Sequence, residues 1–555
     1  MQDESQPILW QPLWRNKSQF TLLARHFIRR MTTIETAEGS EPNFGAAGVL
    51  ALVAAPGAFY SFILFNKYST LLRVLRGGPM QMDVYTASMP DKYLFIACSM
   101  ALTAALVALL WDRILPGKAD HSVLASLPVR MRTIFFANLS AIAFVAVLFI
   151  ADLNAVSSIL FPIVVLSDVP ASLLDNIRFI SVNACCVLIA SSFAFLLCLS
   201  ILAMMMALLP ASLFHRVSTL ARFVIFSVSC ALIWTAFKLP HAFSRNLWIP
   251  PAWYTALYQV LQHRATPELK RSAFTGVVAL AAVFFIALLG LVLSYKRHFM
   301  RIAALSMPSG PKSTLVLASL RFVLNRTLLR DGFDRALYWL GIRLLLRSEP
   351  HMIRFGAFCA LGVVIFAGQS LAGAGLMAAS FPLIFLVVIG FRAAVEIPAG
   401  VGAMSVFRIC AVRTNAMPVL RKLLLTILLC TLAPGAFALA LTATALTGVL
   451  HVVFLASAAL VAFEFMLFRY ASIPFTSTSA GFQNRSQMII LLYFIAFLAF
   501  TAAGPFLERA MLPYPLAFAI WPLIALLTPL LTRSFETDEI PPDDGRVVQT
   551  LGIEA

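Results

Sequence analysis

Long apolar runs alternate with short polar or glycine-containing stretches along most of the chain. A helix needs about 20 mostly apolar residues to cross the hydrocarbon core of a membrane. Twelve runs approach this length, and their residue ranges predict the membrane spans. We expect spans near 44–65, 93–111, 135–156, 180–209, 222–237, 275–294, 355–371, 376–394, 423–445, 447–468, 488–504 and 515–532. This pattern predicts an all-α polytopic membrane protein with about 12 transmembrane helices.

One further apolar piece, "SSILFPIVVLSDVP" at 157–170, follows the third span directly. It is too short to cross the hydrocarbon core by itself, and it contains two prolines. We therefore expect an interfacial or re-entrant segment here, separate from the span before it.

The twelve spans fall into two groups of six, with a long basic segment between them. This grouping predicts five regions along the chain. They are a cytoplasmic N-terminal segment at 1–43 with an amphipathic helix, a first half at 44–295, a basic cytoplasmic connector at 296–354, a second half at 355–532, and an acidic cytoplasmic tail at 533–555 that we expect to be disordered.

The composition agrees with a membrane protein, because 60% of the residues are hydrophobic and only 12% are charged. A soluble domain carries about 25% charged residues. The net charge of +17 would indicate nucleic acid in a soluble chain. In a membrane chain it indicates basic residues kept on the cytoplasmic side. With both termini inside, 31 of the 42 Lys and Arg lie on that side.

The N-terminal stretch "FTLLARHFIRRM" has the period of an amphipathic helix. Phe20, Leu23, Phe27 and Met31 form one stripe, and basic residues lie opposite. Such a helix is expected to lie on the inner membrane surface before the first span.

Two charged segments, at 112–134 and 392–422, take the same position between the second and third spans of each half. Each is bounded by prolines and is long enough for a short helix. A rigid helix there could transmit force to the two spans it joins. An ordinary turn with inside charge is the other interpretation. The candidate coupling residues are Asp112, Arg113, Arg130, Arg132, Glu396, Arg408 and Arg413.

Several strings carry a resemblance to one family, namely "DRILPGKADHSVLASLPVRMRTIF", "PPAWYTALYQVL", "IPFTSTSAGFQN" and "VVQTLGI". The chain resembles the permease of a bacterial type-2 ABC exporter, with two six-span units fused. The resemblance implies a connecting helix before each unit, a coupling helix after the second span, and a large outer segment at 238–274. It also implies ABC ATPase subunits as cytoplasmic partners and a bacterial-type inner membrane. The aromatic residues of that outer segment, Trp248, Trp253, Tyr254 and Tyr258, suit a membrane interface.

The chain itself lacks a recognisable nucleotide site. The nearest string to a phosphate loop is "SGPKST" at 309–314, which has Pro where the second Gly belongs. We therefore expect no cofactor in this chain, with ATP bound on a separate subunit. The partners expected are that ATPase and membrane lipids, and no nucleic acid.

Besides the permease, two alternatives remain open, namely an ion-coupled secondary transporter and an orphan membrane protein without transport activity. An ion-coupled secondary transporter uses charged groups inside spans. Glu464 is the main polar candidate, and we expect it to pair with Arg469 or to reach the headgroups. Weaker polar candidates are Asp152, Asn154, Gln369 and His451. A membrane-embedded enzyme is not expected, because the only carboxylates of the first outer loop are Asp83 and Asp91, which stand eight residues apart and do not form a carboxylate pair with each other.

Overall fold

The computed structural model describes most of the chain as α-helix, in two compact units that divide after Gly310. The described residues are 16–32, 61, 64, 67, 88–114, 116, 118–166, 173–238, 248–302, 321–322, 324–326, 329–371, 373, 375–395, 397, 417–466 and 486–533. The boundary between the units falls inside the segment 296–354. Each unit is considered by itself below.

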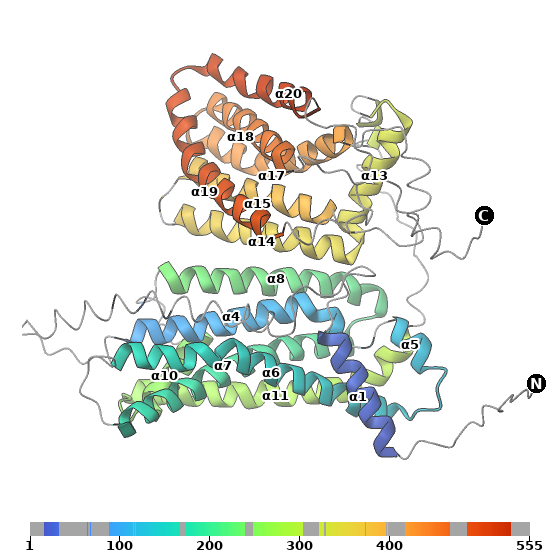
Figure 1. The fold of residues 1–555 in the computed structure, drawn as a ribbon, viewed down its shortest axis with the longest axis vertical. Coiled ribbons are helices and arrows are strands. Elements are labelled where there is room, and N and C mark those ends of the chain that lie inside the picture. Colours follow the sequence, from blue (N-terminus) through green and yellow to red (C-terminus); the bar gives the residue numbers. More distant parts are fainter. Residues whose placement is uncertain are drawn as a thin grey trace, which may run out of the picture. The chain divides into compact units, whose positions relative to one another are not determined.

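Unit 1 is a bundle of long helices with two short helices at opposite ends (Figure 1). Its helices are α1 (Asn16–Thr32), α4 (Met89–Ile114), α5 (Lys118–Leu124), α6 (Met131–Leu166), α7 (Leu173–Leu208), α8 (Ala211–Lys238), α10 (Pro250–Leu261) and α11 (Pro267–Ile302). The long helices α4, α6, α7 and α11 run side by side, with α1 and α5 at one end and α10 at the other.

Unit 2 is a second helical bundle. Its helices are α13 (Gly332–Arg347), α14 (Glu349–Leu371), α15 (Leu376–Val395), α17 (Met417–Thr442), α18 (Ala445–Met466), α19 (Ser486–Met511) and α20 (Ile520–Arg533), with a 3₁₀ turn, η4 (Pro515–Ala519), before α20. The helix α15 lies at the centre, because it packs against α14, α17, α18 and α19.

Ten helices among the described residues are long and apolar enough to cross a membrane, five in each unit. They confirm an all-α polytopic membrane protein, and they match ten of the twelve spans expected from the sequence. The expected span at 44–65 lies almost entirely outside the described residues. The expected span at 515–532 is the turn η4 followed by the 14-residue helix α20, which is shorter than the other ten.

The prediction of a separate interfacial piece after the third span is wrong, because α6 continues without a break to Leu166. Pro162 lies inside this helix and has no N–H to donate to the carbonyl of Ser158. Asn183 on α7 donates its side-chain Nδ2 to that carbonyl at 3.4 Å. The neighbouring helix thereby supplies the hydrogen bond that proline removes, and α6 remains a single helix.

The amphipathic helix expected near the N-terminus is α1, and its apolar stripe packs against α6 and α4 of the same unit. Phe27 is fully buried and Met31 is 9% exposed, while Arg25 and Arg29 are exposed on the other face. The stripe that the sequence suggested for the membrane surface therefore contacts the protein's own helices.

At the other end of unit 1, α10 is inserted among α4, α7 and α11. Tyr254 and Tyr258, which the sequence suggested for the membrane interface, are fully buried, whereas Trp248 is 90% exposed. Burial raises the pKa of Tyr254, and its hydroxyl donates to the carbonyl of Gly276 at 3.2 Å. The ammonium of Lys92, at the start of α4, lies 4.6 Å from the centre of the Tyr258 ring. This cation–π contact joins α4 to α10.

Candidate functional site

The end of unit 1 that carries α1 and α5 holds the first group of predicted site residues. The carboxylate of Asp120 on α5 pairs with the guanidinium of Arg30 on α1, and its other oxygen lies 3.1 Å from His26 Nε2. Arg30 also donates its second terminal nitrogen to the carbonyl of Arg113, at the end of α4, at 2.6 Å. One arginine therefore ties the amphipathic helix to both α4 and the short helix α5.

Hydrogen bonds also connect this end of unit 1 to α6, the span that follows α5. Asn138 on α6 donates its side-chain amide to the carbonyl of Ile114 at 3.3 Å, which satisfies a carbonyl at the end of α4. The carbonyl of Arg130 accepts the backbone N–H of Thr133 at 2.9 Å and so starts α6. The segment between α4 and α6 is thus bonded at both of its ends.

The outward face of this segment carries apolar and basic side chains together. Val123 is 59% exposed and Leu127 is 46% exposed, and the side chains of Arg130 and Arg132, a few residues further along the chain, are also exposed. Leu124 points inward and is buried. The structure therefore divides the segment into an inner face held by the bundle and an outer face available for contact.

The remaining predicted coupling residues are less informative. Asp112 belongs to the last turn of α4, but its side chain is outside the described part of the chain. Glu396, Arg408 and Arg413 also lie outside the described residues, in the gap between α15 and α17.

At one end of unit 2, charged side chains join four helices. Glu464 on α18 is 3% exposed and pairs with Arg421 on α17. The neighbouring Lys422 donates to Asp334 of α13 at 2.6 Å. Arg392 on α15 donates its Nε to the carbonyl of Met466, at the end of α18, at 2.9 Å. The partner of Glu464 is therefore Arg421. The expected partner Arg469 lies outside the described residues.

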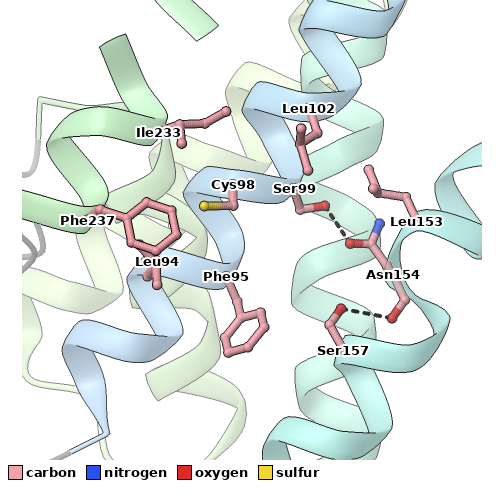
Figure 2. A pocket seen from close by; sticks show the side chains of 10 residues that line it. All are labelled: Leu94, Phe95, Cys98, Ser99, Leu102, Leu153, Asn154, Ser157, Ile233 and Phe237. Carbon is pink, nitrogen blue, oxygen red and sulfur yellow. Dashed lines mark hydrogen bonds between the residues drawn. The ribbon is translucent and has the colours of Figure 1, made fainter. Parts of the chain in front are cut away.

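A cavity of about 160 Å³ lies in unit 1, lined by side chains of α4, α6 and α8 (Figure 2). Its walls are mostly apolar, and Cys98 and Phe237 face it from α4 and α8. Three polar side chains border it: Ser99, Asn154 and Ser157. Ser99 donates to the carbonyl oxygen of the Asn154 side chain at 2.5 Å, and Asn154 donates to Ser191 of α7 at 3.1 Å. These polar groups satisfy one another, so the cavity offers a ligand mainly apolar contact.

A second buried polar group lies within unit 2 and joins α15, α18 and α19. Nε2 of His451 lies 2.9 Å from Ser380 Oγ, and its Nδ1 lies 2.6 Å from Glu508 Oε1. The side chains of His451 and Glu508 are 2% and 1% exposed. The sequence analysis singled out His451 without a partner, and it missed Glu508 because it ended that span at residue 504. The signal that could have found it is the continued apolar run "GPFLERAML", in which Glu508 stands one turn after Gly504.

Known proteins give no further guide to this arrangement. A scan against models of protein families, a search of curated proteins and a search of solved structures each found no match to the chain. Among the described residues, no three His, Cys, Asp or Glu side chains lie close enough to hold a metal ion. The candidate sites are therefore judged by their own geometry.

Proposed function

We propose that the chain is the transmembrane permease of an ABC-type exporter, driven by separate ATPase subunits in a bacterial-type inner membrane. The observation that carries the proposal is the junction of Arg30 with Asp120. It fixes a short helix between two spans to an amphipathic helix that precedes them, and leaves an apolar and basic face exposed.

The positions of three short or amphipathic helices support this function. The helix α1 comes before the first span, α5 lies between α4 and α6, and α10 lies between α8 and α11. In the permease family that the chain resembles, these are the positions of the connecting helix, the coupling helix and the outer segment. The proposal puts both termini and the α5 end on the cytoplasmic side, in agreement with the distribution of Lys and Arg.

The bonds of the junction provide a mechanism for coupling. An ATPase that binds Val123, Leu127 and the two arginines would push on a segment that is bonded to α1, α4 and α6. Because these contacts are buried or partly buried, the segment would transmit movement to the spans rather than bend alone. A matching contact in the second half would fall at 392–422.

The cargo would be hydrophobic or amphiphilic. The spans offer few fixed charges for a polar substrate, and the cavity beside α4 is lined mainly by apolar side chains. A molecule with an apolar body would gain contact there, at about 25 cal/mol per Å² of apolar surface removed from water.

An ion-coupled secondary transporter is the second candidate, because unit 2 buries two carboxylates, Glu464 and Glu508, within its spans. Such groups often mark ion pathways in membrane proteins. The experiment that separates the candidates is purification of the chain from its native membrane, followed by assay for an associated ATPase. An ATPase that remains bound supports the permease. Uptake of a cargo by proteoliposomes of the chain alone, driven by a proton gradient, supports the secondary transporter.

A further inference from the structure

The proposed coupling makes no use of the polar group formed by Ser380, His451 and Glu508. We propose that this group is a buried proton-binding site, which holds one exchangeable proton between His451 and Glu508 and releases it when α19 moves away from α15 and α18. This inference goes beyond the proposed function and does not depend on an ATPase.

The hydrogen bonds of Ser380 establish how the protons are arranged. Its Oγ lies 2.6 Å from the carbonyl of Met377 and 2.9 Å from His451 Nε2. A hydroxyl has one proton to donate and a carbonyl can only accept, so the shorter contact takes the hydroxyl proton. Ser380 then accepts a hydrogen bond from Nε2–H, and the His451 ring carries its proton on the side that faces Ser380.

This arrangement leaves a second proton in the bond between His451 Nδ1 and Glu508 Oε1, which are 2.6 Å apart. If the proton were absent, the lone pair of Nδ1 would face the carboxylate. The proton therefore belongs to the pair, and the pair carries no net charge whichever partner holds it. A neutral pair is the form that burial in a low-dielectric interior favours.

Loss of that proton requires a rearrangement that the geometry allows. The Ser380 hydroxyl would turn from Met377 to donate to Nε2, and the ring would move its remaining proton to Nδ1, opposite the carboxylate of Glu508. The site would then carry one negative charge. No described group donates to Glu508 Oε2, which is fully buried, so the charged form needs water or a new donor. Proton release is thereby linked to opening of the site.

The helix that carries Glu508 is suited to such a movement. The span of α19 has the smallest buried share of the ten candidate spans, at 11%, whereas that of α15 is 78% buried. Gly504, one turn before Glu508, lies against the ring of Phe381, and a Cβ at this position would overlap that ring. The contact between α19 and α15 beside this site therefore consists of Gly504 and the ring of Phe500, both against the ring of Phe381.

Other charged groups on the packed helices lie away from the site. Glu464 is 13 residues from His451 on α18, which at a rise of about 1.5 Å per residue places it about 20 Å away. Arg509, next to Glu508 in the chain, is exposed. The other titratable or charged residues in the described parts of α14, α15, α17 and α20 are Glu349, His351, Arg354, Cys359, Arg392, Arg421, Lys422, Cys430 and Arg533. Glu349, His351 and Arg354 lie near the start of α14, Arg392 near the end of α15, and Arg421 and Lys422 near the start of α17. Ser380 and His451 lie near the starts of α15 and α18, which follow α14 and α17 after short connections, so these charged groups are at the opposite ends of the helices.

The same three residue types form the catalytic group of serine hydrolases, but this geometry does not favour a nucleophile. Ser380 is 6% exposed and lies within α15, whose backbone N–H groups are used by the helix itself. Its hydroxyl proton is directed to Met377 rather than to His451. Proton exchange is therefore the chemistry that the geometry supports.

The test is infrared difference spectroscopy of the purified chain in lipid nanodiscs, recorded at a series of pH values. We expect a reversible change in the carboxyl and imidazole bands of the wild type. Glu508→Gln should abolish it, while Glu464→Gln, the matched control at another buried carboxylate of unit 2, should retain it. His451→Asn should abolish it as well.

A wild-type difference spectrum that is unchanged in Glu508→Gln would overturn the proposal, as would the absence of any reversible change in the wild type. If Glu508→Gln does not fold, His451→Asn replaces it in the test: loss of the spectral change supports the proposal, and an unchanged spectrum overturns it. Ser380→Ala gives a second measurement, because loss of the acceptor for Nε2–H should shift the midpoint of the titration without removing the bands. An unshifted midpoint in Ser380→Ala would contradict the hydrogen-bond arrangement on which the inference rests.

Discussion

Arg30 of α1 and Asp120 of α5 are 90 residues apart in the chain and form an ion pair in which both side chains are mostly buried. The pair converts an amphipathic helix, which could simply lie on a membrane, into a fixed part of the bundle. It also fixes the position of the segment that the sequence analysis suggested for coupling.

Removing this pair should release α1 from the bundle. Hydrogen bonds to charged groups contribute about 1.5–3 kcal/mol. We therefore expect Arg30→Ala or Asp120→Ala to raise amide exchange in α1 by tenfold or more, since about 1.4 kcal/mol corresponds to a factor of ten. Hydrogen–deuterium exchange with mass spectrometry measures this, and Arg25→Ala, on the exposed face of α1, is the control. Equal exchange in Asp120→Ala and Arg25→Ala would show that the pair does not hold α1.

Removing Arg421 and removing Glu464 should lower the free energy of unfolding by different amounts. Glu464 is 3% exposed and Arg421 is 24% exposed, so a carboxylate left alone would be the more deeply buried charge. We expect Arg421→Gln to lower the free energy of unfolding by about 3 kcal/mol, the lower end of the range for breaking a buried pair, and Glu464→Gln to lower it by less. The double variant should recover part of the loss. Unfolding in mixed detergent micelles gives these values, and a larger cost for Glu464→Gln would contradict the structure.

The hydrogen bond from the Asn183 side chain to the carbonyl of Ser158 should contribute to stability mainly because Pro162 is present. Asn183→Ala leaves a buried carbonyl without a donor, which costs about 1–3 kcal/mol. In a Pro162→Ala background the helix regains its own N–H donor, so the cost of Asn183→Ala should fall. A double-mutant cycle of unfolding free energies measures this coupling. Additive costs would mean that Asn183 does not substitute for the missing N–H.

Two glycines in unit 2 should differ in their tolerance of alanine. A Cβ at Gly504 would overlap the ring of Phe381, whereas nothing lies within 4 Å of a Cβ at Gly435. We expect Gly504→Ala to cost about 1–3 kcal/mol, as in other overpacked cores. Gly435→Ala should be neutral or stabilising, because alanine favours the helix. Phe381→Leu should relieve part of the cost at Gly504, and equal effects at the two glycines would contradict this packing.

Much of the fold could be predicted from the sequence, because the lengths of the apolar runs and their interruptions follow directly from the membrane. The errors came from contacts between helices. Pro162 suggested a break that Asn183 prevents, and Tyr254 suggested an interface although α10 is inserted into the bundle.

The candidate site was predicted only in part, for a similar reason. The charges around α5 were visible in the sequence, but the attachment of Asp120 to Arg30 depends on folding across 90 residues. Glu508 was missed because an apolar pattern cannot show that a carboxylate near the end of a span faces a histidine on another helix.

The central claim is that the exposed face of the segment around α5 binds an ATPase, and reversal of its basic charges tests this most directly. Arg130→Glu together with Arg132→Glu places negative charges opposite the negative groups of the partner that the arginines would bind. This repulsion weakens binding more than loss of the attraction alone. Arg330→Glu with Arg343→Glu is the matched control, since both residues are exposed and lie in the basic segment that is predicted to face the same side.

The measurement is the ATPase activity that remains with the chain after affinity purification from its native membrane. We predict that the wild type and the control pair retain it, while the variant at Arg130 and Arg132 inserts and folds normally but loses it. A wild-type chain that never carries an ATPase, or a variant at Arg130 and Arg132 that carries as much as the control, would contradict the account.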